Sequence, residues 1–193
     1  MSKRDDFYHS ILIVSASEQF DLLVKKSLAG FTTIDIRKSA SMARRCILER
    51  YYDIVVINSP LPDETGEDFA IFVTEKCNAS VLMVTPQDVY EDALSRVTDF
   101  GVLIVPKPSP RGRIDKAIRY LVAVQDKIHT VEKKAQAAEE KLEEMRTVSK
   151  AKFILVEKKH MTEDEAHRLI GKMAMDNGIS RGRAARMILD EEE

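Results

Sequence analysis

The sequence predicts a doubly wound α/β domain followed by an all-helical C-terminal part. Up to about residue 110, short apolar runs rich in β-branched residues alternate with helical patterns. Between residues 111 and 149 there is no proline, and the apolar residues recur at steps of three and four. The chain has 193 residues, which is enough for one large domain or two small ones.

Five runs are expected to form the strands of one parallel sheet. Their apolar character is continuous rather than alternating, which is typical of strands that helices cover on both faces. The runs lie at residues 11–14, 32–36, 54–57, 81–84 and 102–105, and the second is the weakest. With right-handed crossovers, we predict the flavodoxin-like strand order 2-1-3-4-5. A ligand site would then lie at the carboxyl ends of strands 1 and 3.

Residues 114–149 are expected to form a coiled-coil helix, because their apolar positions follow a heptad pattern. The alternative is a solvated helix that docks on its own domain, and the first two turns are expected to do so. A parallel homodimer would place Lys127 opposite Glu132 of the second copy, whereas antiparallel pairing would set Lys against Lys. The expected dimer seam consists of Leu121, Val124, Ile128, Val131, Ala135, Ala138, Leu142 and Met145.

The C-terminal part is expected to form three helices around a small core. The long helix should continue to about Lys159. Thr162 and Glu165 have the spacing of a capping box, which opens a second helix. Gly178 tolerates a positive φ and should end that helix, and Ser180 should cap the third.

Composition and charge exclude several classes of protein. The two cysteines, Cys46 and Cys77, exclude a disulfide scaffold and are expected to be core residues rather than redox sensors. No window approaches the roughly 18 apolar residues of a membrane span, and the first residues are unlike a signal peptide. We therefore expect a soluble, cytoplasmic protein. Residues 1–110 hold 12 basic and 16 acidic residues, whereas 150–189 hold 9 and 5, so the two parts should have different partners.

Residues 9–124 resemble a bacterial receiver domain, the phosphoacceptor half of two-component response regulators. The resemblance rests on the loop from Ser59 to Gly66, on Thr85 at the end of the fourth strand, and on Lys107 before Pro108. It implies a phosphoacceptor site at the carboxyl ends of the strands.

The residues that perform the family's chemistry are replaced. In receivers the third strand ends in the Asp that accepts the phosphoryl group, and here that position is Asn58. Two Mg²⁺-binding acids follow the first strand in receivers, and here Ser15 and Ala16 occupy their positions. Ile104 stands at the aromatic switch position. The resemblance therefore implies a degenerate, non-phosphorylatable receiver, or pseudo-receiver.

The degenerate pocket would consist of Ser15, Ala16, Asn58, Thr85 and Lys107. Two interpretations stay open for its polar residues. Thr85 and Lys107 are purely structural in the first, with Lys107 bonded to Asn58 or to a strand-end carbonyl. In the second, Ser15, Asn58, Thr85 and Lys107 form a repurposed pocket for an anion or small molecule.

Residues 133–189 resemble an ANTAR domain, the RNA-binding module of antitermination regulators. The matching segments are 151–152, 162–166 and 174–176, together with Leu169. Phe153 departs from the family, which commonly has a small residue there, and the acidic tail at 190–193 would repel RNA. Arg181 and Arg183 lie in the first helical turn, where free N–H groups favour an anion. The residues expected to bind RNA are Lys152, Lys158, Lys159, Arg168, Lys172, Arg181, Arg183 and Arg186.

These inferences predict three parts: a pseudo-receiver at 1–124, a coiled-coil helix at 114–149, and an ANTAR domain with an acidic tail at 133–193. The expected function is transcription antitermination by binding a structured leader RNA. The alternatives are an adaptor for an acidic protein, or a DNA-binding regulator with a helix-turn-helix at 163–175 and 181–189. A signalling protein or ligand could act on the pseudo-receiver. No metal-spaced His/Cys cluster or Gly-rich phosphate loop occurs, so we expect no enzymatic activity, cofactor, metal or membrane partner.

Overall fold

The computed structural model describes residues 9–28 and 33–192 of the chain. They divide into two compact units, Met1–His129 and Thr130–Glu193, which share the long helix α5 (Arg111–Lys159). No helix in these ranges combines the length and the apolar character that a membrane span requires.

The first unit contains a five-stranded parallel sheet in the order β2-β1-β3-β4-β5, which confirms the predicted topology. Thr32, at the start of the weakest predicted strand, lies outside the described residues. The strands are β1 (Ser10–Val14), β2 (Thr33–Arg37), β3 (Ile54–Asn58), β4 (Ser80–Pro86) and β5 (Leu103–Lys107).

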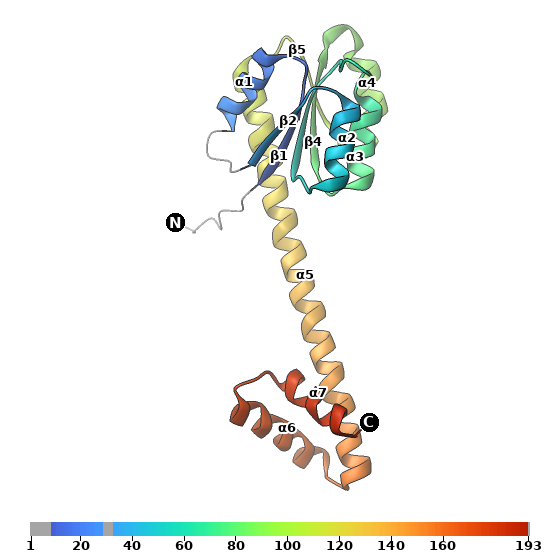
Figure 1. Ribbon diagram of the computed structural model, residues 1–193, viewed down its shortest axis with the longest axis vertical. Helices are drawn as coiled ribbons and strands as arrows, with labels where there is room; N and C mark the ends of the chain where they lie inside the picture. Colours follow the sequence, from blue (N-terminus) through green and yellow to red (C-terminus); the bar gives the residue numbers. More distant parts are fainter. Residues whose placement is uncertain (1–8, 29–32, 193) are drawn as a thin grey trace. The chain divides into compact units, whose positions relative to one another are not determined.

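Helices cover both faces of the sheet, which explains why its strands are continuously apolar (Figure 1). Leu12 and Val14 of β1 pack toward α2, α3 and α4, whereas Ile11 and Ile13 pack toward α1 and the first turns of α5. Cys46 is buried in the first of these cores. The helices are α1 (Glu18–Ser27), α2 (Ala40–Glu49), α3 (Glu67–Lys76) and α4 (Tyr90–Val97), with short 3-10 turns at Gln87–Val89 and Thr98–Phe100.

Side-chain caps fix where several of these helices begin. The hydroxyls of Ser17 and Ser39 accept hydrogen bonds from the third residues of α1 and α2. Gly66 starts α3 at a φ of 107°, which a residue with a Cβ rarely adopts. These three N-cap residues end the loops that follow β1, β2 and β3 at the carboxyl edge of the sheet.

The second unit is a three-helix module built from the end of α5, α6 (Glu163–Asn177) and α7 (Arg181–Glu192). Thr162 and Glu165 form the predicted capping box, and Gly178 ends α6 at a φ of 63°. Ser180 Oγ accepts the N–H of Arg183 and so caps α7 as predicted. Small side chains dominate the core, which consists of Ala151, Leu155, Ala166, Ile170, Ala174, Ala184, Ala185 and Ile188.

The predicted dimer seam divides into two parts along α5. Leu121 was expected in the seam, but it is 4% exposed and packs against the sheet of its own unit, so it is not available to a second copy. Val124 and Ile128 are half-buried. Val131, Ala135, Ala138, Leu142 and Met145 are exposed. The seam, which stays a prediction, is therefore confined to the part of α5 after Leu121.

Candidate functional site

At the carboxyl edge of the sheet, Asn58 ends β3 beside the loop that follows β1. Its amide Nδ2 donates a hydrogen bond to Ser15 Oγ over 3.0 Å, and both residues are buried. Its Oδ1 is buried and has no hydrogen-bond partner among the described residues. The site is thus held by an uncharged amide–hydroxyl pair.

Lys107 and Thr85 tie the neighbouring strands together. Lys107 Nζ donates to the Ser59 carbonyl over 2.5 Å, which matches the interpretation in which it bonds a strand-end carbonyl. Partial burial lowers the pKa of Lys107 below its usual value. Thr85 is fully buried, with its hydroxyl 3.3 Å from that of Ser59. Both residues have structural partners across the ends of β3, β4 and β5.

Carboxylates around this edge have partners of their own. Asp21 of α1 forms an ion pair with Lys38 at 2.6 Å. Asp63 accepts the N–H groups of Ala40 and Ser41 at the start of α2, and these hydrogen bonds lower the pKa of the Asp63 carboxyl. Ala16 is exposed and brings no ligand atom. Asp21 and Asp63 therefore have structural roles at this edge.

The predicted five-residue pocket does not form one open cavity. A cleft of about 440 Å³ lies between α1 and the start of α5, and only Asn58 and Lys107 of the five residues line it. Ser15 and Thr85 are fully buried instead. Much of the remaining wall is apolar, formed by Phe20, Leu23, Val84 and Ile114.

The sequence predicts an anion site at the N-terminus of α7 in the second unit, and the hydrogen bonds in the structure contradict this prediction. The N–H of Gly182 donates to Glu144 Oε1 of α5 over 2.8 Å, and that of Arg183 donates to Ser180 Oγ over 3.2 Å. The N–H of Ala184 donates to the Ser180 carbonyl. A carboxylate of the chain therefore occupies the position that an incoming phosphate would take.

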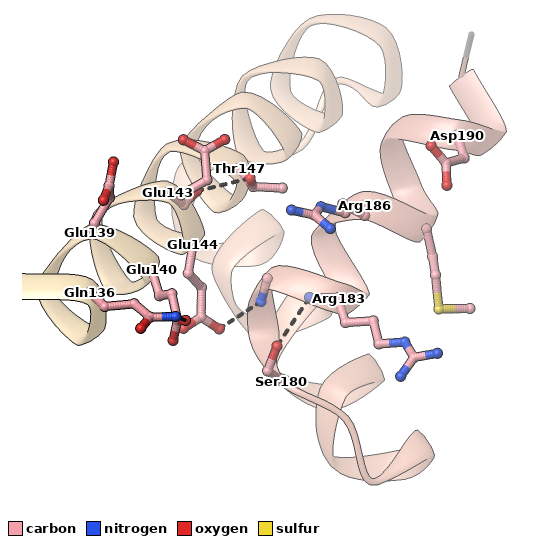
Figure 2. Close-up of a pocket in the computed structure, with 12 residues that line it drawn as sticks. Gln136, Glu139, Glu140, Glu143, Glu144, Thr147, Ser180, Arg183, Arg186 and Asp190 are labelled. Atoms are coloured by element: carbon pink, nitrogen blue, oxygen red, sulfur yellow. Dashed lines mark hydrogen bonds between the residues drawn. The ribbon is translucent and has the colours of Figure 1, made fainter. Parts of the chain in front are cut away.

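A cleft of about 980 Å³ separates α5 from α7 at this place (Figure 2). Its α5 wall carries four glutamates, Glu139, Glu140, Glu143 and Glu144. Its α7 wall carries Arg183, Arg186 and Asp190. Figure 2 shows Arg186 directed toward the cleft and Arg183 directed away from the glutamates. The two arginines therefore stand in different electrostatic surroundings.

Sequence reasoning missed the orientation of Phe153. This ring is 62% exposed and is absent from the three-helix core, which Ala151 and Leu155 occupy on the same helix. It borders two shallow clefts of about 630 and 380 Å³, whose lining includes Lys150 and Lys152. An exposed aromatic ring is a surface on which a nucleic-acid base can stack.

The sequence of this helical module matches a described domain family. Residues 136–189 match the profile of the ANTAR domain. These residues form an ANTAR domain. The match begins in the exposed part of α5 and ends one residue before Asp190, so it covers the three-helix core and leaves out the acidic tail.

The chain is also similar to a curated transcriptional regulator. The chain is 28% identical over 139 residues to the transcriptional regulatory protein PdtaR of Mycobacterium tuberculosis, covering 72% of this chain and 67% of the relative.

Solved structures place the first unit in the receiver fold. The signal receiver domain of an HD domain-containing protein from Pseudomonas fluorescens Pf-5 matches with a TM-score of 0.58 and 16% identity, over 67% of this chain and 98% of that one. The chemotaxis response regulator CheY4 of Vibrio cholerae matches with a TM-score of 0.52 and 16% identity, over 60% of this chain and 99% of that one. At these identities the likeness concerns the fold.

Within the ANTAR domain, the predicted RNA-binding residues fall into separate groups. Lys152 forms an ion pair with Glu163 at 2.5 Å, which lowers the pKa of that carboxyl, so one predicted RNA contact already has an acidic partner. Seven other side chains are exposed: Lys158 and Lys159 at the end of α5, Arg168 and Lys172 on α6, and Arg181, Arg183 and Arg186 on α7.

Proposed function

We propose that this chain is an RNA-binding regulator of transcription antitermination whose ANTAR domain contacts a structured leader RNA. The observation that carries the proposal is the set of seven exposed Lys and Arg side chains on a domain of the ANTAR family. Such charge supplies salt-dependent affinity for phosphates. Phe153 adds a stacking surface for an unpaired base. This function places the protein in the cytoplasm, where transcripts are made.

The mechanism is a shift of an RNA folding equilibrium. RNA that binds the domain in one fold only is stabilised in that fold by the difference in binding free energy. The antiterminator hairpin is then favoured over the terminator. In this scheme the protein binds and does not catalyse a reaction.

The proposal includes a receiver-like domain that does not accept a phosphoryl group. An amide at Asn58 is not the carboxylate nucleophile of the family, and Ser15 and Ala16 offer no carboxylate ligand for Mg²⁺. The Asn58–Ser15 hydrogen bond and the Lys107–Ser59 contact support this, because Asn58 Nδ2 and Lys107 Nζ already have partners within the protein. Input would then arrive through a ligand or a protein.

We further propose a parallel homodimer through α5. Val131, Leu142 and Met145 are 58%, 50% and 59% exposed, which leaves an apolar row along the helix without intramolecular cover. Burial of this row in a second copy supplies the driving force. Two ANTAR domains would then be available to one RNA.

Gel shifts of the full chain test the RNA assignment. The probes are stem-loop RNAs with randomised loops and duplex DNA of equal length, each at two salt concentrations. We expect RNA binding that weakens with salt and is reduced by Arg168→Gln or Arg181→Gln, whereas the control Lys116→Gln in the first unit leaves it unchanged. Tighter binding of the duplex DNA would support the helix-turn-helix alternative. Binding of neither nucleic acid would favour the adaptor.

A further inference from the structure

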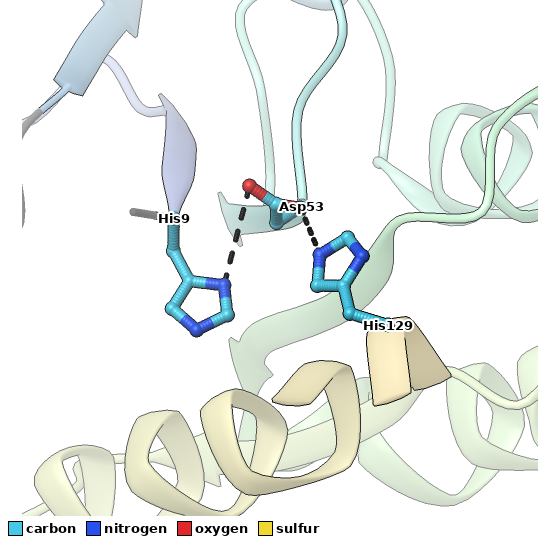
Figure 3. A group of neighbouring side chains, drawn as sticks. All are labelled: His9, Asp53 and His129. Atoms are coloured by element: carbon cyan, nitrogen blue, oxygen red, sulfur yellow. Dashed lines mark hydrogen bonds and ion pairs between the residues drawn. The ribbon is translucent and has the colours of Figure 1, made fainter. Parts of the chain in front are cut away.

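Two histidines and an aspartate meet at the amino ends of β1 and β3, the edge opposite Asn58. His9 precedes β1, Asp53 precedes β3, and His129 lies on α5, so the three come from distant parts of the sequence (Figure 3). One ligand-type atom from each lies within 4.8 Å of those of the other two. No spacing motif in the sequence could have revealed this group.

One nitrogen of each imidazole ring lies near the carboxylate of Asp53. His129 Nε2 lies 2.8 Å from Asp53 Oδ1, and His9 Nδ1 lies 4.0 Å from Asp53 Oδ2. The planes of the two rings are tilted by 30° and their centroids lie 6.1 Å apart. His9 and Asp53 are each 4% exposed, whereas the His129 side chain is 23% exposed, so one side of the group remains open to solvent.

Second contacts orient these donors. The other ring nitrogen of His9, Nε2, lies 2.9 Å from Asp126 Oδ1. A histidine that binds a metal usually has such a carboxylate on its second nitrogen. Asp53 Oδ2 accepts the N–H and hydroxyl of Ser10 over 2.7 and 3.0 Å, which holds the carboxylate at the strand edge. Asp126, His9 and Asp53 therefore have the pattern of a supported ligand set.

We propose that His9 Nδ1, His129 Nε2 and an oxygen of Asp53 bind one divalent transition-metal ion, with Zn²⁺ as the best fit. Two imidazoles and one carboxylate are ligands that Zn²⁺ takes, and a water molecule from the open side completes four-coordination. Bonds of about 2 Å require neighbouring donor atoms about 3.3 Å apart. The group meets this requirement after side-chain shifts on the order of 1 Å.

Binding replaces one interaction and releases protons. The His129–Asp53 hydrogen bond gives way to two metal–ligand bonds, and any proton carried by His129 Nε2 or His9 Nδ1 passes to solvent, because only the deprotonated nitrogen binds a metal. The aspartate charge offsets one of the two positive charges of the ion.

The site joins the last turn of α5 that belongs to the first unit to two strands of the sheet. His129 is the final residue of that unit, and Gln125, one turn earlier, already bonds the carbonyls of Asp53 and Asn78. A bound ion adds a link at the place where the helix leaves the sheet. Metal would therefore act as an input to the receiver-like domain, through a site separate from the degenerate phosphoacceptor pocket.

Calorimetric titration of tag-free, chelator-treated full chain with Zn²⁺ tests the proposal. We expect one bound equivalent and a higher melting temperature of the first unit. Co²⁺ in place of Zn²⁺ should give visible absorption bands of nitrogen and oxygen coordination. His129→Gln, whose amide can still bond Asp53, should lower the affinity at least tenfold while helicity is retained. His9→Gln should act in the same way.

His167→Gln is the matched control, because His167 is exposed on α6 and lies outside the cluster. This variant should bind Zn²⁺ with the affinity of the parent. Cys77→Ser should also bind like the parent. Three outcomes would overturn the assignment: no bound equivalent, parental affinity in His129→Gln, or loss of binding in Cys77→Ser. In the first case the three residues form a hydrogen-bond network only. RNA binding is measured separately, so failure here is distinguishable from failure of the antitermination proposal.

Discussion

The carboxylate of Glu144 accepts a hydrogen bond from the backbone N–H of Gly182 and thereby links α5 to the N-terminus of α7. Gly182 permits this approach, since a Cβ at this position would lie 2.7 Å from Glu144 Cγ. The negative charge also meets the positive end of the α7 dipole. An RNA phosphate could use these N–H groups only by displacing Glu144.

Glu144→Ala should reduce the free energy of unfolding of the ANTAR domain by about 1 kcal/mol, the usual contribution of a capping interaction. Gly182→Ala alone should change it little, because a gain of up to about 1 kcal/mol in helix propensity offsets the displaced cap. In the Glu144→Ala background, Gly182→Ala should become stabilising. Denaturant titrations of the parent, the two single variants and the double variant measure the coupling between Glu144 and Gly182. Strictly additive changes in the free energy of unfolding would contradict it.

Acid should destabilise the start of α6. Lys152 lowers the pKa of Glu163, and the Thr162 N–H and hydroxyl lower that of Glu165, from ordinary values of 4.5. Because both pKa values are lower in the folded state, the stability that the two carboxylates contribute is complete at pH values above 4.5. It is lost as the pH falls below that value and the carboxylates become protonated. Melting followed by circular dichroism should show a weaker acid dependence for Glu163→Gln. The control Glu157→Gln should behave like the parent.

Acetyl phosphate with Mg²⁺ should leave the intact mass of the protein unchanged. Asn58→Asp should remain unphosphorylated as well, because Ser15 and Ala16 supply no carboxylate to hold the cation. A hydroxylamine-labile phosphate on the parent protein would refute the degenerate site. Mass spectrometry decides between these outcomes.

Phe153→Ala should weaken RNA binding by about 1–3 kcal/mol if its ring stacks on a base. The helices should remain folded, because the side chain is 62% exposed and outside the core. Met175→Ala is a suitable control, since it removes an 82% exposed apolar side chain from the same domain. Equal RNA affinities for both variants and the parent would exclude stacking at Phe153.

Leu142→Lys should convert a dimer into a monomer in sedimentation at micromolar concentration. Leu142 is 50% exposed, so the charge enters the proposed seam without disturbing an intramolecular core. Leu48→Lys makes the same chemical change at a 76% exposed position of α2 and should leave the dimer intact. A parent protein that is already monomeric under these conditions would contradict the coiled-coil proposal.

The topology of the sheet and the helix boundaries of the ANTAR domain could be predicted because each depends on local patterns. β1 is apolar on both faces, and Thr162, Gly178 and Ser180 act within their own turns. Leu121 was wrongly assigned to the dimer seam. The same heptad pattern continues from the turns of α5 that pack on the sheet into the exposed part of the helix, so it does not show where the packing ends.

Contacts between distant residues escaped the sequence analysis. Glu144 reaches Gly182 over 38 positions, and His129 reaches Asp53 over 76. No periodicity encodes such pairs, because they depend on how packed helices place individual side chains. For the same reason, the orientation of Phe153 could be read only from the packed helix.

The alanine-rich core of the ANTAR domain has a thermal consequence. A buried alanine removes less apolar surface from water than a buried leucine, and Leu155, Ile170 and Ile188 are the large side chains among the eight residues of its buried core. A unit of this size with so little buried area is marginally stable by itself. Heating should therefore melt this domain before the sheet, in two separate calorimetric steps. Since a ligand of the folded state raises only the step of the unit it binds, the lower step should report RNA occupancy directly.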